Sequence, residues 1–244
     1  MATDDAPLAG KVVLITGGSR GAGLATAHRL GSAGAAVSLT ARDLAALNAA
    51  VDGLLADGIR AMGRVGDVTD PTAMDAAVTA TEQEYGGLDV LVNNAGIGRY
   101  GPVAEQPPDE WRQVIEVNLL GVFHATRVAL PALRRRGGGQ IIAISSGAAR
   151  QGYPNMSAYC ASKAALEGFM RALAAEVEHE PIKCATIVPG GILTDFGIRT
   201  RADREASMSS GAKYLEPEDV ADAIYYLLTQ PPRAWTQEMT LWPR

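Results

Sequence analysis

The chain has 244 residues and a formal net charge of −5 at neutral pH, with 47% hydrophobic and 20% charged residues. This composition suits one soluble domain with a sizeable core, and the acidic balance argues against nucleic acid or an anionic membrane as a main partner. We expect a cytoplasmic protein, because the acidic first residues do not resemble a signal peptide and no apolar run approaches the ~18 residues that span a bilayer. The two cysteines, Cys160 and Cys184, have no metal-site spacing and suggest no disulfide framework.

The first expected strand is the apolar run of residues 11–16, which continues into Gly17-Gly18-Ser19-Arg20-Gly21-Ala22-Gly23 and then a helical pattern. Glycines let the backbone turn tightly and approach a phosphate, and the N-terminus of the following helix favours negative charge. The spacing is Gly-x-x-x-Gly-x-Gly rather than the commoner Gly-x-Gly-x-x-Gly, and glycines can also form a simple strand-to-helix turn. The position after the first strand favours phosphate binding.

The second expected strand, residues 36–41, ends next to Arg42. In dinucleotide-binding folds the residue at this strand end reads the 2′ position of the adenosine ribose. Arg42 can pair with a 2′-phosphate, and Arg20 in the glycine loop can approach it from the other side. Both arginines could instead be solvated surface charges, and Asp43 follows at once. Their joint placement predicts NADP rather than NAD.

A helix over 43–57 and a third strand over 60–65 lead to Asp67, which could bind an adenine amino group or cap the helix expected at 71–85. Because Thr69 or Asp70 could cap that helix equally well, we expect Asp67 to be freer for a ligand. A fourth strand, 88–92, ends in Asn93-Asn94-Ala95-Gly96. These amides and small residues suit the edge of a flat ligand, although a turn alone would also explain them.

A helix that begins near Pro108 carries Asn118 in an apolar stretch, where an amide needs buried partners or a water. The next strand, 140–146, ends at Ser146, whose hydroxyl could hold a substrate oxygen. Tyr159 and Lys163 are four residues apart on the following helix and therefore share one face. We expect the lysine cation to lower the phenol pKa from ~10, which would make Tyr159 a proton donor or acceptor. Taken alone, a Tyr-x-x-x-Lys pair is more often a surface pair.

A strand over 182–188 runs into Pro189-Gly190, and a polar stretch that we interpret as a substrate lid covers about 194–216. A helix over 217–229 and a strand over 236–241 follow. Strands and helices that alternate in this way predict an α/β fold: a single Rossmann-like domain with a doubly wound, seven-stranded parallel sheet. We expect a flexible N-terminal tail over 1–8 and one catalytic domain over 9–244.

The motifs form one ordered set: Thr16-Gly17-x-x-x-Gly21-x-Gly23, Asn93-Asn94-Ala95-Gly96, Asn118, Ser146, Tyr159-x-x-x-Lys163, Pro189-Gly190 and Thr194. Each motif is weak alone, but the set resembles the short-chain dehydrogenase/reductase family from about residue 8 to 242. Two departures are visible. Ala22 stands where the family usually has isoleucine, and the chain reaches Leu241-Trp242-Pro243 without the frequent C-terminal glycine tail, which could alter subunit contacts or the substrate mouth.

This resemblance implies roles for four catalytic residues. Tyr159 would be the general acid or base, Lys163 would lower its pKa and bind the nicotinamide ribose, Ser146 would polarise the substrate oxygen and Asn118 would fix a water that relays protons. The resemblance also implies a larger set of NADP(H)-binding residues: Gly17, Ser19, Arg20, Gly21, Ala22, Gly23, Arg42, Asp67, Val68, Asn94, Ala95, Gly96, Tyr159, Lys163, Pro189, Gly190, Ile192 and Thr194.

We therefore expect an NADPH-dependent oxidoreductase that reduces a ketone or aldehyde, or runs the reverse reaction, without a metal. One alternative is a catalytically silent NADP-binding regulator, which would usually have lost the tyrosine or lysine. Another is a lyase or epimerase, which would usually have a longer segment after Thr194. The partner is expected to be a small carbonyl or alcohol substrate, and the resemblance implies a homotetramer (or homodimer) built through the helices of Asn118 and Tyr159.

Overall fold

The computed structural model describes residues 6–244 and contains one seven-stranded sheet in the order β3-β2-β1-β4-β5-β6-β7. All neighbouring strands are parallel. The strands are β1 Val12–Thr16, β2 Ala36–Ala41, β3 Ala61–Val65, β4 Val90–Asn93, β5 Gly139–Ile144, β6 Ile182–Pro189 and β7 Glu238–Leu241. The predicted doubly wound parallel sheet is confirmed, and its order reverses between β1 and β4, where such sheets bind ligands.

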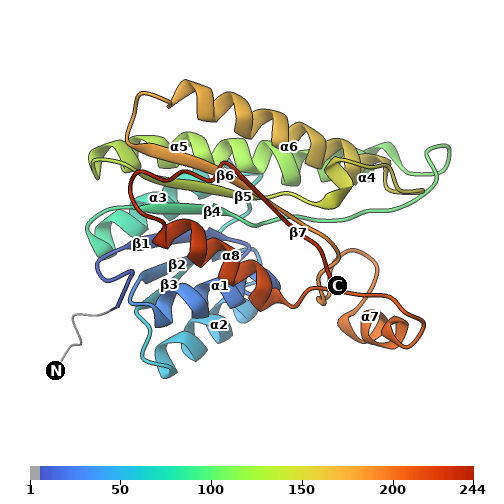
Figure 1. The fold of residues 1–244 in the computed structure, drawn as a ribbon, viewed down its shortest axis with the longest axis horizontal. Coiled ribbons are helices and arrows are strands. Elements are labelled where there is room, and N and C mark those ends of the chain that lie inside the picture. The colour runs from blue at the N-terminus through green and yellow to red at the C-terminus, as the bar shows by residue number, and fades with distance from the viewer. Residues whose placement is uncertain (1–5) are drawn as a thin grey trace.

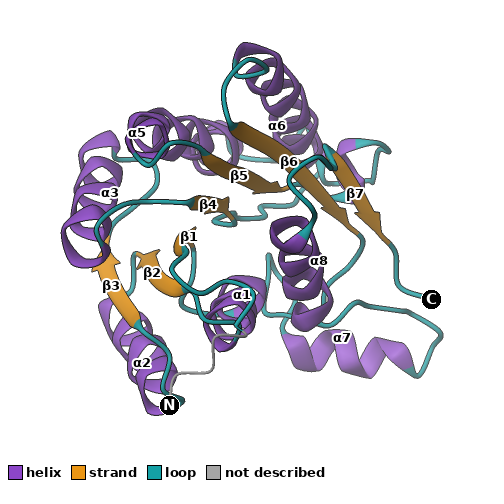
Figure 2. Ribbon diagram, turned by 60° about the vertical axis from the view of Figure 1, so that its left-hand side comes forward, coloured by secondary structure: helices purple, strands orange, loops and turns teal. Residues whose placement is uncertain are grey.

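Helices cover both faces of the sheet (Figures 1 and 2). One face carries α1 (Gly21–Ser32), α2 (Leu44–Ala56) and α8 (Pro217–Thr229); the other carries α3 (Pro71–Tyr85), α4 (Pro108–Ile115), α5 (Gly121–Arg135) and α6 (Ser157–Glu176). The short helix α7 (Arg201–Met208) lies to the side of these layers, beyond the carboxyl ends of the strands.

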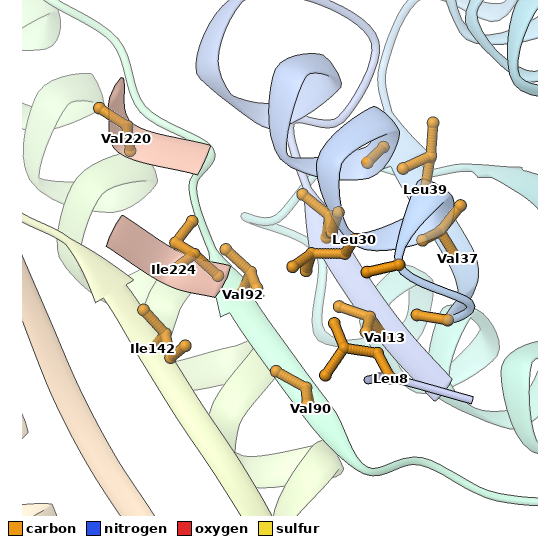
Figure 3. Close-up of a cluster of buried hydrophobic side chains, with 14 of the residues drawn as sticks. Leu8, Val13, Leu30, Val37, Leu39, Val90, Val92, Ile142, Val220 and Ile224 are labelled. Atoms are coloured by element: carbon orange, nitrogen blue, oxygen red, sulfur yellow. The ribbon is translucent and has the colours of Figure 1, made fainter. Parts of the chain in front are cut away.

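The two faces explain the continuous apolar runs in the strands. Val13 and Ile15 pack into the cluster under α1, α2 and α8, part of which Figure 3 shows, whereas Leu14 packs into the cluster under α3, α5 and α6. In β4, Leu91 likewise faces the second cluster, and its neighbours on each side face the first. A strand buried on both faces has no polar side to alternate with.

One helical run, Pro108–Arg135, is long and apolar enough to cross a membrane by length and composition. It consists of α4, a π-helical turn η1 (Glu116–Leu120) and α5. The apolar side chains on its inner side, among them Val117, Val122 and Leu133, lie in the second core cluster. Packing against the sheet and its neighbouring helices therefore accounts for the apolar character of this inner side. By length and composition, the expectation that no apolar run approaches the span of a bilayer is wrong for this segment.

The N-terminal segment differs from the sequence-based expectation. Leu8 is 2% exposed, packs in the first core cluster beside Val13, and its backbone N–H donates to the carbonyl of Ala33 at 2.9 Å (Figure 3). The prediction of a flexible tail is therefore wrong at Leu8, because one apolar side chain closes the end of the β1–α1 layer. Residues 1–5 of the predicted tail lie outside the described residues.

Truncation of the Leu8 side chain tests whether it is packed in the core. We expect Leu8→Ala to lower the free energy of unfolding by about 2–4 kcal/mol, as is typical when a buried leucine leaves a cavity. Urea unfolding would measure the change, with Leu55→Ala as the control, because Leu55 is 51% exposed on α2. If Leu8→Ala lowered the free energy of unfolding no more than Leu55→Ala does, the segment around Leu8 would be detached from the core in solution.

Candidate active site

Tyr159 and Lys163 stack one turn apart on α6, as their spacing predicts, and both are buried, at 8% and 4% exposure. The Lys163 ammonium donates to the carbonyl of Ile144, at the end of β5, over 2.8 Å. It lies 5.8 Å from the centre of the Tyr159 ring. The pair therefore sits at the carboxyl edge of the sheet, where β5 ends.

The electrostatics of this pair differ from the sequence-based expectation. Burial raises the pKa of Tyr159 well above its ordinary value of 10.0, and the influence of the Ser146 hydroxyl lowers it only in part. Burial also lowers the pKa of Lys163 from 10.5 to about 8. The prediction that the lysine lowers the phenol pKa is wrong for this arrangement, because loss of hydration is the largest influence on both groups and Lys163 is not among the groups that lower the pKa of Tyr159. The phenol is protonated at neutral pH.

Ser146 comes two residues after the end of β5 and caps the 3₁₀ turn η2 (Gly147–Ala149). Its Oγ accepts a hydrogen bond from the backbone N–H of Ala148 at 3.2 Å. The next residue, Gly147, lies under the ring of Trp242, where a Cβ would come within 2.5 Å of the indole. Glycine is therefore required beside Ser146 for the C-terminal segment to cover this loop.

Asn118 is fully buried in the π-helical turn η1, and its side chain is anchored to the loop after β4. Its Oδ1 accepts from the N–H of Ile97 at 2.8 Å, and its Nδ2 donates to the Ile97 carbonyl at 3.0 Å and to Ser162 Oγ at 3.1 Å. A Cβ on Gly96 would lie 3.3 Å from Asn118 Oδ1 and 3.7 Å from Lys163 Nζ. The helix irregularity thus places the amide close to Lys163, as π-bulges often do at functional sites.

Two aromatic rings from separate loops cover Tyr159. Tyr100 meets the Tyr159 ring edge-on with centroids 6.2 Å apart, and Phe196 does so at 5.7 Å. Tyr100 fits there because Gly98 and Gly197 lack side chains; a Cβ at either position would lie within 2.6 Å of the Tyr100 ring or hydroxyl. Phe196 belongs to the predicted lid, and no sequence pattern signals that it reaches Tyr159.

The glycine loop, the Asn94 loop and Thr194 meet at the ends of β1, β4 and β6. Gly17 has φ +65° and Gly21 has φ +56°. A Cβ on Gly17 would lie 2.9 Å from the Cα of Ala95, and one on Gly21 would lie 3.3 Å from the methyl group of Thr194. The predicted cofactor residues of these three segments are therefore brought together, and the bare backbone of the loop leaves a cradle that side chains would fill.

Asn94 supports this loop from behind. Its Nδ2 donates to the carbonyls of Thr16 and Gly17, both at 3.0 Å, and its backbone N–H donates to Thr16 Oγ1 at 3.1 Å. Thr16 Oγ1 also accepts from the N–H of Ala95 at 3.1 Å. Thr16 therefore fixes the Asn94 loop against the glycine loop, a role that the motif spacing does not reveal.

The end of β2 carries the predicted adenosine-binding groups. Arg42 lies 3.7 Å from Asp67, while Asp67 Oδ1 accepts from both the N–H and the Oγ1 of Thr69 at 2.9 Å. Asp67 is thus already engaged, contrary to the expectation that it is freer for a ligand. Asp43 caps α2 by accepting from the N–H of Ala46, so this carboxylate is occupied away from Arg42.

The neighbouring positions are favourable for an anion. Arg20 is exposed at the start of α1, whose first turn has no acidic residue, and no carboxylate pairs with it among residues 6–244. Val68, also predicted at the adenine, is 7% exposed and packs against the position of Gly121 at the start of α5. The cradle, the helix N-terminus and two arginines together fit a phosphorylated dinucleotide.

The loop after β6 lies at the same edge of the sheet. The N–H of Gly190 donates to the carbonyl of Leu241 on β7, at 2.8 Å, and Ile192 forms a bridge with Leu215. Arg204 holds the start of the predicted lid by donating to the carbonyls of Thr194 and Phe196, at 2.9 and 2.8 Å. The part of the chain that the structure describes holds no cluster of three candidate metal ligands.

Comparison with known proteins agrees with this geometry. The model of the short-chain dehydrogenase family matches residues 11–205. The chain is a member of the short-chain dehydrogenase/reductase family. It is 34% identical over 244 residues to a putative ketoacyl reductase of Streptomyces coelicolor (93% of this chain, 92% of the relative) and 33% identical over 234 residues to a 3-oxoacyl-[acyl-carrier-protein] reductase of a Synechocystis species (96% and 95%).

Further matches extend the comparison. The chain is 36% identical over 241 residues to the glycine betaine reductase ATRR of Emericella nidulans and spans only 19% of the length of that protein. A metagenomic short-chain oxidoreductase solved in complex with NADP superposes with a TM-score of 0.84 at 34% identity, covering 98% of this chain and 99% of that one. A Burkholderia cenocepacia short-chain dehydrogenase, also in complex with NADP, gives 0.86 at 34% identity, with 96% and 97% covered.

The buried lysine of this short-chain dehydrogenase/reductase predicts a dependence of stability on pH. Its pKa of about 8 in the folded chain lies below the ordinary 10.5, so the unfolded chain binds more protons between these values and stability rises with pH through this window. At pH 7 we therefore expect Lys163→Met to stabilise the protein by up to about 3 kcal/mol, less the value of the lost hydrogen bond to Ile144.

Urea unfolding at pH 7 and pH 10 would measure this effect, with the exposed Lys213→Met as control. The increase in the free energy of unfolding caused by Lys163→Met should be smaller at the higher pH. If the variant and the wild type differed in this free energy by the same amount at both pH values, the argument from burial would be contradicted.

Proposed function

We propose that the protein is an NADPH-dependent reductase that converts a ketone or aldehyde into an alcohol, and that it also catalyses the reverse oxidation. The observation that carries this proposal is the buried Tyr159 phenol, which interacts with Ser146 and shares a helix face with Lys163 beside the glycine cradle. No observation favours the catalytically silent alternative, because both the tyrosine and the lysine are present and buried on one face of α6.

Bound NADPH would supply the hydride to the carbonyl carbon. Tyr159 then gives its proton to the substrate oxygen, a role that suits a phenol whose pKa is raised so that it carries its proton at neutral pH. Ser146 donates a hydrogen bond to the same oxygen and stabilises the negative charge that develops there. Such donors act more strongly in a buried site than in water.

Lys163 and Asn118 complete the proposed proton path. With a pKa of about 8, Lys163 gains and loses a proton easily near neutral pH, so it can return a proton toward Tyr159. We assign to Asn118 the placement of a relay water near Lys163. Its amide is fixed by the hydrogen bond from the N–H of Ile97, and both its Oδ1 and the Lys163 ammonium lie close to Gly96. In the oxidation direction the phenol would accept the alcohol proton and the path would run in reverse.

For the cofactor, we propose that Arg42 and Arg20 bind a 2′-phosphate and that the remaining predicted residues line the cleft. Asp43 supports this choice because it caps α2 and does not pair with Arg42, and a 2′-phosphate would replace the exposed 3.7 Å contact of Arg42 with Asp67. The metagenomic and Burkholderia relatives were solved with NADP, whereas a 7α-hydroxysteroid dehydrogenase with a TM-score of 0.87 was solved with NADH. The choice therefore depends on this chain's own side chains.

We further propose a cytoplasmic homotetramer or homodimer built through the helical layer of α4, α5 and α6. Its support is an apolar outer surface: Trp111, Leu120 and Phe123 are 38%, 43% and 43% exposed, and Phe123 meets the ring of Phe169 on α6. The ketoacyl reductases among the relatives make a β-keto compound a reasonable first substrate to assay.

Removal of the phenol hydroxyl tests the chemistry. We expect Tyr159→Phe to lower kcat for ketone reduction by at least ~10²-fold, because the general acid is lost. NADPH binding, followed by fluorescence, should change little. Tyr226→Phe is the matched control, since Tyr226 is 54% exposed on α8. Wild-type rates in Tyr159→Phe would rule out the mechanism.

Cofactor choice is tested at the end of β2. We expect Arg42→Ala to weaken NADPH binding by ~10–100-fold, the effect of losing a charge-assisted hydrogen bond, and to leave NADH binding nearly unchanged. Titration of both cofactors would measure this, with Arg112→Ala as control, because Arg112 pairs with Asp109 on the exposed side of α4. An equal loss for both cofactors would show that Arg42 does not read the 2′ position.

A further inference from the structure

Glu167 is a buried acid that the proposed mechanism does not use. It lies on α6, one turn beyond Lys163, and is 7% exposed. A buried carboxylate is costly unless it is paired and hydrogen-bonded, so its partners indicate what it holds in place.

The partners of Glu167 lie on both sides of Ser146 in the chain. Ser145 Oγ donates to its Oε1 at 3.0 Å, and the guanidinium of Arg150 lies 3.5 Å from its Oε2. Arg171, one turn further along α6, approaches Oε2 at 4.0 Å but is 70% exposed and contributes little. One carboxylate therefore ties both ends of the segment 145–150 to the helix that carries Tyr159.

The same segment is also tied to the sheet. The N–H of Ser145 donates to the carbonyl of Ile187 on β6 at 2.8 Å. Arg150 pairs with Glu238 at 2.5 Å and donates to Thr240 Oγ1 at 3.2 Å, both on β7. These contacts fix the segment relative to the sheet. Glu167 connects both of its ends to the Tyr159 helix, against which the turn η2 in its middle also packs.

We propose that Glu167 is a positioning residue that sets Ser146 at its working distance from Tyr159. The inference rests on the proposed function in that it assumes Ser146 acts on the substrate oxygen. Displacements of about 1 Å at a reacting centre can cost ~10²-fold in rate. Glu167 thus controls the reaction through Ser146, while the cofactor residues at β1, β2 and β6 do not depend on it.

The kinetic test is a double-mutant cycle that combines substitutions at Glu167 and Ser146. We expect Glu167→Ala to lower kcat for reduction of a β-keto ester by ~10-fold or more with little change in the Kd of NADPH, and Glu167→Gln, which keeps an acceptor for Ser145, to lower it less. In a Ser146→Ala background, Glu167→Ala should cause no further loss. Equal losses in both backgrounds would overturn the proposal, whereas a normal rate for Ser146→Ala alone would instead contradict the proposed function.

Hydrogen exchange gives a readout that needs no turnover. In Glu167→Ala the amides of residues 145–150 should exchange faster, and those of the glycine loop at 17–23 should not change. Glu180→Ala serves as the control, because it removes an acid that pairs with Arg134 away from this segment. Unchanged exchange over 145–150 in folded Glu167→Ala would overturn the proposal even if the protein reduced none of the ketones assayed.

Discussion

The burial of two ionisable side chains on one face of α6 is the constraint on which the rest of the site depends. Tyr159 and Lys163 lose most of their hydration, and burial moves their pKa values in opposite directions, up for the phenol and down for the ammonium. Both groups are thereby biased toward neutral forms. A neutral phenol and a lysine close to its titration point suit the transfer of a proton, although the buried ammonium reduces the stability of the folded chain at neutral pH.

The sheet supplies the remaining parts of the site at its carboxyl edge. Loops that follow β1, β4, β5 and β6 meet there because the strand order reverses between β1 and β4. Close contacts at this edge depend on backbone without side chains at Gly17 against Ala95, at Gly96 against Asn118 and at Gly147 against Trp242. The same edge holds the ring of Trp242 over Gly147 and Gly190, so the C-terminal segment joins the serine loop to the loop after β6.

The chain also shows how charge is arranged for an anionic cofactor without a large net positive charge. Carboxylates near the end of β2 are occupied, since Asp43 caps a helix and Asp67 accepts from Thr69. Arg20 and Arg42 remain exposed at the same edge. Local placement, rather than the overall charge of −5, therefore determines which ligand the cleft favours.

Local patterns in the sequence determined the order of the strands and helices, the shared face of Tyr159 and Lys163 and the glycine turn after β1, because helix spacing and backbone freedom depend on neighbouring residues alone. Tertiary structure decided the rest. The packing of Leu8, the approach of Asp67 to Arg42, the cover of Tyr159 by Phe196 and the direction of its pKa shift all depend on segments far apart in the chain or on burial. No local pattern encodes which distant side chain removes water from a phenol.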